Sequence, residues 1–121
     1  MSRIMLVDDD GDMARITGRW LEKAGHEVTL AVSGKEALSM VGSVRPDLII
    51  LDYAMPEMDG PAVFEALRSD PANKDIPVLF RTGKDDGDSE EILNRLRPDG
   101  IVLKSEGKVP LMDAVGKLLP G

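Results

Sequence analysis

The chain has 121 residues, and 15 Lys and Arg against 22 Asp and Glu give it a formal net charge of −7 at pH 7. This acidity disfavours nonspecific binding to nucleic acids or acidic membranes, and an aromatic content of 3% disfavours a base-stacking surface. The absence of cysteine excludes a disulfide framework and a thiolate metal site. A chain of this length buries roughly two thirds of its unfolded surface, so we expect one domain over residues 1–121.

The N-terminal segment has only four apolar residues between Arg3 and Asp8, too few for the core of a signal peptide. No apolar run in the sequence approaches the length of a membrane span. We therefore expect a soluble cytoplasmic protein.

The first half of the chain alternates strand and helix patterns. The apolar run at residues 4–7 ends at Asp8, Asp9 and Asp10, which predicts a buried strand followed by a polar loop. Helical spacing of apolar residues predicts a helix over about residues 12–24. Residues 27–31 alternate polar and apolar, which predicts an edge strand, and Ser33 is placed to cap a second helix.

The second half repeats this alternation. A second apolar run, residues 48–51, ends abruptly at Asp52 and predicts another buried strand. A loop follows, and a third helix begins near Gly60, because proline is tolerated in the first turn. Residues 76–80 predict a fourth strand and residues 81–88 a polar loop. Residues 92–96 belong to a short fourth helix, residues 101–103 predict a fifth strand ending at Lys104, and residues 110–119 predict a fifth helix.

Five strands and five helices in single file predict an α/β fold, a parallel sheet with helices on both faces. The carboxyl ends of parallel strands share one edge, which brings together five polar residues: Asp8, Asp9, Asp52, Thr82 and Lys104. Each residue alone suits a loop or a cap, but together they are what phosphoryl chemistry with a divalent metal requires. Carboxylates about 5 Å apart repel by roughly 3 kcal/mol per pair at an effective dielectric constant near 20, so the cluster needs a counter-charge such as Mg²⁺.

The residues that follow the strands resemble the receiver domain of two-component response regulators. The resemblance covers essentially the full chain and rests on Asp8-Asp9, Leu51-Asp52, Met55-Pro56, Asp59-Gly60, Thr82-Gly83 and Lys104. It implies a doubly wound, flavodoxin-like (βα)5 fold, a three-layer sandwich whose parallel sheet has strand order 2-1-3-4-5.

The resemblance also implies the role of each site residue. Asp52 would accept a phosphoryl group from the phosphohistidine of a sensor histidine kinase or a histidine phosphotransfer protein. Asp9, Asp52 and the backbone carbonyl of Ala54 would ligate Mg²⁺, and Asp8 would assist through water. Thr82 would move toward the phosphoryl group, and Lys104 would pair with it.

The implied output is a rearranged surface on the fourth helix, fifth strand and fifth helix, which gains or loses an unknown downstream protein. We expect a monomer or a weak dimer through this surface, with no nucleic acid bound by the domain. The protein would not be an enzyme beyond assisting its own phosphorylation and dephosphorylation. The chain is either a stand-alone regulator or a receiver cut from a longer protein.

Three features depart from the family pattern. Lys104 is followed by Ser105 instead of a cis proline, and a cis bond before a residue other than proline costs about 3 kcal/mol, so the direction of Lys104 is open. Ile101 stands where a Tyr or Phe gate is common, and Arg81 stands where an aliphatic residue is usual, without a physical explanation from the sequence. Neither Ala54 nor Lys84 can orient a hydrolytic water, which predicts slow self-dephosphorylation.

Three alternatives remain. A flavodoxin-like cofactor binder would need a phosphate loop where Asp8, Asp9 and Asp10 would repel phosphate. A metal-dependent phosphatase would need a second carboxylate at the position of Ala54. A degenerate receiver that acts as a phosphorylation-independent docking module is the strongest of the three.

Overall fold

The computed structural model describes residues 2–83 and 87–119, in which five strands alternate with five α-helices as predicted. In chain order, the elements are β1 (Arg3–Val7), α1 (Gly11–Lys23), β2 (Glu27–Ala31), α2 (Gly34–Val44), β3 (Leu48–Asp52), α3 (Gly60–Ser69), β4 (Val78–Thr82), α4 (Ser89–Leu96), β5 (Gly100–Leu103), the 3₁₀ helix η1 (Lys104–Glu106) and α5 (Lys108–Leu118). Within the described ranges, every helix is too short or too polar to cross a membrane.

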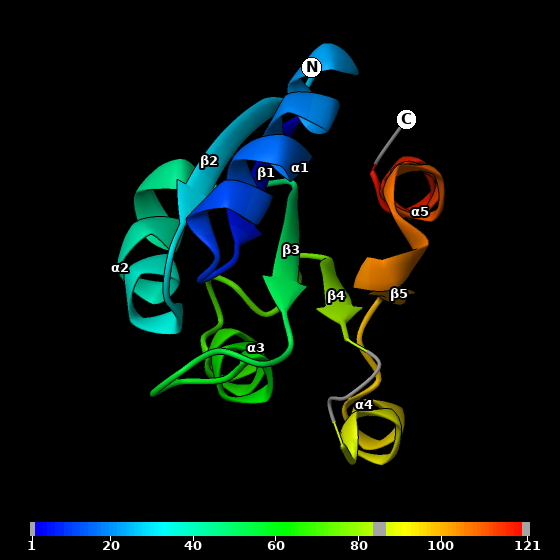
Figure 1. Ribbon diagram of the computed structural model, residues 1–121. Coiled ribbons are helices and arrows are strands. Elements are labelled where there is room, and N and C mark those ends of the chain that lie inside the picture. Colours follow the sequence, from blue (N-terminus) through cyan, green and yellow to red (C-terminus); the bar gives the residue numbers. More distant parts are fainter. Residues whose placement is uncertain (1, 84–86, 120–121) are drawn as a thin grey trace.

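The five strands form one parallel sheet in the order β2-β1-β3-β4-β5 (Figure 1). This confirms the predicted strand order and the doubly wound α/β class. The alternating strand β2 lies at the edge, whereas β3, which reads as a continuous apolar run, lies at the centre and is buried along its whole length. The sequence pattern therefore places β2 and β3 correctly, whereas β5, which also reads as an apolar run, lies at the other edge and is largely exposed.

Helices cover both faces of the sheet and complete the three-layer sandwich (Figure 1). Buried residues of α2, α3 and α4 pack on one face, and buried residues of α1 and α5 pack on the other. Side chains along β3 alternate between these two cores, so Ile50 faces α1 and α5 while Leu51 faces the opposite layer. Continued by one residue, this alternation places Asp52 on the face of α1 and α5.

Polar side chains begin the first three helices. The Ser33 hydroxyl accepts a hydrogen bond from the Glu36 amide at 3.1 Å, so the predicted cap of α2 is confirmed. The Asp10 carboxylate accepts hydrogen bonds from two amides of the first turn of α1, and Asp59 caps α3 in the same way. The third acid after β1 therefore has a structural role at a helix terminus, where a carboxylate also complements the helix dipole.

The fourth strand differs from its predicted position at residues 76–80, because the structure places β4 at Val78–Thr82. Pro77 has no amide hydrogen, and the ladder begins beside it, where the Asp99 carboxylate accepts a hydrogen bond from the Val78 amide at 2.7 Å. At its other end, β4 continues through Arg81 and Thr82, which pair with β5. Arg81 was predicted to open the following loop and instead belongs to the sheet.

Candidate phosphoryl-transfer site

The ends of β1 and β3 bring two carboxylates side by side. Val7 pairs with Leu51 in the parallel ladder, so Asp8 and Asp52 occupy the next position on neighbouring strands. Both side chains are buried, with 1% and 4% of their surface exposed, whereas Asp9 is exposed at the rim. The apolar runs that end at these acids thus deliver them to one edge of the sheet.

Asp8, Asp9 and Asp52 form an acidic cluster in which one carboxylate oxygen from each lies within 4.8 Å of the others. Asp8 Oδ1 accepts a hydrogen bond from the Asp10 amide at 2.9 Å, but Asp8 Oδ2 is buried with no hydrogen-bond partner among the described residues. A buried carboxylate oxygen without a donor, such as Asp8 Oδ2, is costly, and the three neighbouring carboxylates repel one another. The donor set therefore suits a hard divalent cation, which prefers oxygen ligands.

Lys104 supplies a positive charge to this cluster. Its Nζ donates a hydrogen bond to Asp52 Oδ2 at 2.7 Å and lies 3.9 Å from Asp8 Oδ1. The Lys104 side chain is about 28% exposed, so its ammonium is partly desolvated. The direction of Lys104, which Ser105 left open in the sequence, is thus toward Asp52.

The Asp52 carboxyl is tuned mainly by burial. Burial is the main reason why its pKa is raised from 3.8 to about 7. The hydrogen bond from Lys104 opposes this rise, and the negative charge of Asp8 adds to it. The protein without a bound cation therefore holds Asp52 only partly ionised near neutral pH. A cation in the acidic cluster would favour the ionised, nucleophilic form.

Two further predicted site residues lie outside the acidic cluster. Thr82 ends β4, the strand next to β3, and Ala54 follows Asp52 by two residues in the chain. Thr82 is the last residue of β4, 4% exposed, and its hydroxyl makes no hydrogen bond to Asp52 within the described ranges. It lines a cavity of about 420 Å³ together with residues of α4 and β5. Ala54 is exposed in the loop after β3, and Lys84 lies outside the described residues.

Gly60 allows the loop after β3 to close tightly against Asp52. Its amide donates a hydrogen bond to the Tyr53 carbonyl at 2.8 Å. A Cβ at this position would lie 2.8 Å from Phe80 Cε1 and would also clash with the backbone carbonyl of Asp52. Only glycine therefore allows α3 to begin this close to the end of β3.

The sequence pattern did not predict the role of Arg81 at this site. It is only 2% exposed, and its Nη1 donates a hydrogen bond to the buried Thr17 hydroxyl of α1 at 3.1 Å. Burial lowers the pKa of this guanidinium, while the charges of Asp8 and Asp52 raise it. The signal in the sequence is that Arg81 directly continues an apolar strand. Its burial there depends on carboxylates from other strands, which the local pattern does not contain.

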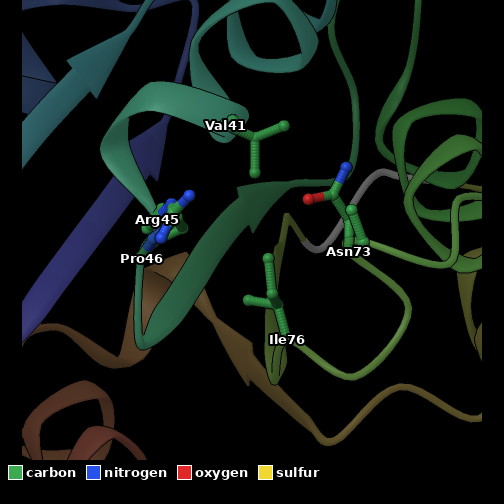
Figure 2. Close-up of a pocket in the computed structure, with 7 residues that line it drawn as sticks. Val41, Arg45, Pro46, Asn73 and Ile76 are labelled. Atoms are coloured by element: carbon green, nitrogen blue, oxygen red, sulfur yellow. The ribbon is translucent and has the colours of Figure 1, made fainter.

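A separate cavity of about 370 Å³ lies at the other end of the sheet (Figure 2). Pro46 and Ile76, which line it, precede β3 and β4, whereas Asp52 is the last residue of β3. None of the described residues that line this cavity carries a carboxylate. It does not contribute to the acidic cluster.

A family model described as the response regulator receiver domain matches residues 4–116. The DNA-binding dual master transcriptional regulator RpaA of Synechocystis sp. is 34% identical over an alignment that covers 91% of this chain and 52% of RpaA. Response regulator MprA of Mycolicibacterium vanbaalenii is 42% identical, over 69% of this chain and 35% of MprA. The chain thus spans about half or less of the length of these curated relatives.

Solved structures show the same fold. The receiver domain of a signal transduction histidine kinase from Syntrophus aciditrophicus has a TM-score of 0.91 at 32% identity, covering 98% of this chain and 90% of that one. The chemotaxis protein CheY4 of Vibrio cholerae has a TM-score of 0.87 at 28% identity, covering 98% of this chain and 99% of that one.

Proposed function

This chain belongs to the response regulator receiver domains, and from that premise we propose that it is a phosphoacceptor whose phosphorylated residue is Asp52. The observation that carries the proposal is the position of Asp52, a buried carboxylate with a lysine ammonium 2.7 Å away and two further carboxylates beside it. In the transfer, an Asp52 carboxylate oxygen forms a bond to phosphorus as the phosphorus–nitrogen bond of a phosphohistidine breaks. The bonding electron pair stays on the imidazole nitrogen, and the product on this chain is an acyl phosphate.

We propose that the acidic cluster holds Mg²⁺ through Asp9 and Asp52, with the Ala54 carbonyl as a further ligand and Asp8 acting through water. The unpartnered, buried Asp8 Oδ2 supports this, because the oxygen has no other described donor. When bound, Mg²⁺ would supply charge compensation between the carboxylates and the oxygens of the incoming phosphoryl group. Lys104 is placed to pair with the negative charge on the phosphorylated Asp52, and Thr82 is the nearby hydroxyl donor.

The output surface that we propose consists of α4, β5 and α5. Ile101 and Leu103 of β5 are 47% and 36% exposed, and Val109 of α5 is 68% exposed. Thr82 lines the same cavity as Ile101 and Leu103. A displacement of Thr82 toward Asp52 would therefore change the shape of the cavity next to the exposed face of β5. Ile101 cannot act as an aromatic gate, so the change would reach a downstream protein through α4, whose Leu93 and Asn94 line the same cavity as Thr82.

The experiment is phosphorylation by acetyl phosphate and by a sensor histidine kinase, in Mg²⁺ and in a chelator, followed by intact-protein mass spectrometry. We expect one phosphoryl group that requires Mg²⁺ and is absent in Asp52→Asn. Asp59→Asn is the matched control, because Asp59 is an exposed carboxylate nearby and Asn preserves the cap of α3. Phosphorylation that persists in Asp52→Asn would show that another residue is the acceptor, and none in the wild type would favour the phosphorylation-independent docking module.

We also propose slow self-dephosphorylation. Ala54, two residues beyond Asp52, is exposed but has no group that can orient an attacking water. The acyl phosphate should therefore last many minutes in Mg²⁺, and Ala54→Asn should shorten its lifetime. A wild-type lifetime of seconds in the hydrolysis assay would contradict this proposal.

A further inference from the structure

The buried ionisable residues of this protein are gathered at one place. Among the described residues, those that are charged and buried are Asp8, Asp52 and Arg81, at the carboxyl ends of β1, β3 and β4. Arg81 pairs directly with Asp52 in the ladder, and the Arg81 carbonyl accepts a hydrogen bond from the Tyr53 amide at 2.9 Å. Side chains at paired positions of parallel strands lie on the same face, so the guanidinium and the carboxylate share the face of α1 and α5.

The guanidinium has incomplete hydrogen bonding for a group so deeply buried. Nη1 donates to the Thr17 hydroxyl at 3.1 Å, but Nε is buried with no partner among the described residues. A buried cation with few neutral acceptors needs negative charge nearby. Asp8 and Asp52 are the carboxylates that act on it, and their charge opposes the lowering of its pKa by burial.

Arg81 therefore faces the same carboxylates that a divalent ion would neutralise. Two cations near one acidic cluster repel each other, and this repulsion is strong where water is excluded. Lys104 adds to the local positive charge, but it is partly exposed and can move toward water. Arg81 has no such freedom, because it is buried within the sheet and held by Thr17.

We propose that Arg81, positioned by Thr17, is a built-in counter-cation of the acidic cluster that weakens divalent-ion binding and stabilises the cluster when no ion is bound. This inference rests on the Mg²⁺ site of the proposed function. It makes Arg81 a residue that tunes the metal requirement of phosphorylation. The competing explanation is that Arg81 only packs β4 against α1.

The first test is Mg²⁺ titration of Arg81→Met and the wild type by isothermal titration calorimetry. A unit charge roughly 8 Å from a divalent ion changes the affinity about tenfold even at an effective dielectric constant of about 60, close to that of water, and by more at the value of about 20 used for the carboxylate cluster. We therefore expect Arg81→Met to bind Mg²⁺ at least about tenfold more tightly. Arg81→Lys keeps the charge and should stay within about threefold of the wild type. An affinity in Arg81→Met that is unchanged or weaker would overturn the proposal.

The second test separates charge from packing by comparing Ca²⁺ with Tb³⁺, which are similar in size. A charge effect scales with ion charge, so a tenfold gain for Ca²⁺ predicts about a thirtyfold gain for Tb³⁺. Equal gains for the two ions would indicate packing and would contradict the proposal. Thr17→Val is the matched control, because it removes the hydrogen bond but leaves the charge, and its gain should be smaller than that of Arg81→Met.

Stability measurements cover the case in which Arg81→Met folds poorly without an ion. The increase in Tm caused by saturating Mg²⁺ should be larger in Arg81→Met than in the wild type, because the ion replaces the lost counter-charge. An equal or smaller increase would refute the inference. If the wild type binds no divalent ion, the Mg²⁺ part of the proposed function fails; the inference then stands only if Arg81→Met binds one, and fails otherwise.

Discussion

Replacing Asp52 with Asn should change how the stability of the protein depends on pH. In the folded protein without a divalent ion, the pKa of Asp52 is raised by burial from 3.8 to about 7. The folded state therefore binds a proton that the unfolded state has already released between about pH 4 and about pH 7. The contribution of Asp52 to the free energy of unfolding is fully present below pH 4 and is lost as the pH rises through 7.

The size of this effect follows from the pKa change. A pKa difference of 1 corresponds to about 1.4 kcal/mol, so ionisation of Asp52 costs the folded protein at most about 4 kcal/mol. Solvent screens this energetic cost only weakly, because Asp52 is only 4% exposed. Asp52→Asn cannot ionise, and its amide oxygen can still accept a hydrogen bond from Lys104. The variant should therefore gain stability relative to the wild type as the pH rises.

The assay is urea denaturation of wild type and Asp52→Asn at intervals from about pH 4 to pH 8 in a chelating buffer. The difference between their free energies of unfolding should grow in favour of Asp52→Asn across this range. Saturating Mg²⁺ should reduce the difference, because the ion stabilises the ionised wild-type cluster. A difference that stays constant within about 0.5 kcal/mol from pH 4 to pH 8 without Mg²⁺ would refute the reasoning.

Substitutions at three further positions test the scaffold. Gly60→Ala would place a Cβ 2.8 Å from Phe80 and against the Asp52 carbonyl, so it should cost about 1–3 kcal/mol in urea denaturation and slow phosphorylation by acetyl phosphate. Asp10→Ala removes the cap of α1 and should cost about 1 kcal/mol, whereas Asp10→Asn should cost less and Mg²⁺ affinity should change little in either. Asp99→Ala removes the acceptor for the Val78 amide and Arg68, and should destabilise by about 1 kcal/mol without changing the phosphorylation rate, because it lies at the opposite end of β4. The role given to Gly60 would be wrong if Gly60→Ala left phosphorylation unchanged. The role given to Asp10 would be wrong if Asp10→Asn lost Mg²⁺ binding, and that of Asp99 would be wrong if a folded Asp99→Ala were phosphorylated more slowly.

The order of strands and helices was open to prediction because each element carries its own local signal. The apolar runs that end at Asp8 and Asp52 mark central strands, and the alternating residues 27–31 mark the edge. Since the carboxyl ends of parallel strands share one edge, these positions also predicted that the acids would meet, and the structure places Asp8, Asp9 and Asp52 within 4.8 Å.

Other features depend on contacts between distant segments, which local patterns do not contain. Arg81 belongs in a polar loop by its own chemistry, and it enters the sheet because Asp8 and Asp52 supply negative charge and Thr17 supplies an acceptor. Lys104 had an open direction, and its approach to Asp52 depends on how η1 leaves the end of β5. The sequence by itself thus determined which carboxylates gather at the sheet edge. Only the tertiary structure decided which cations neutralise them, because a charge is buried only where the folded chain provides its partner.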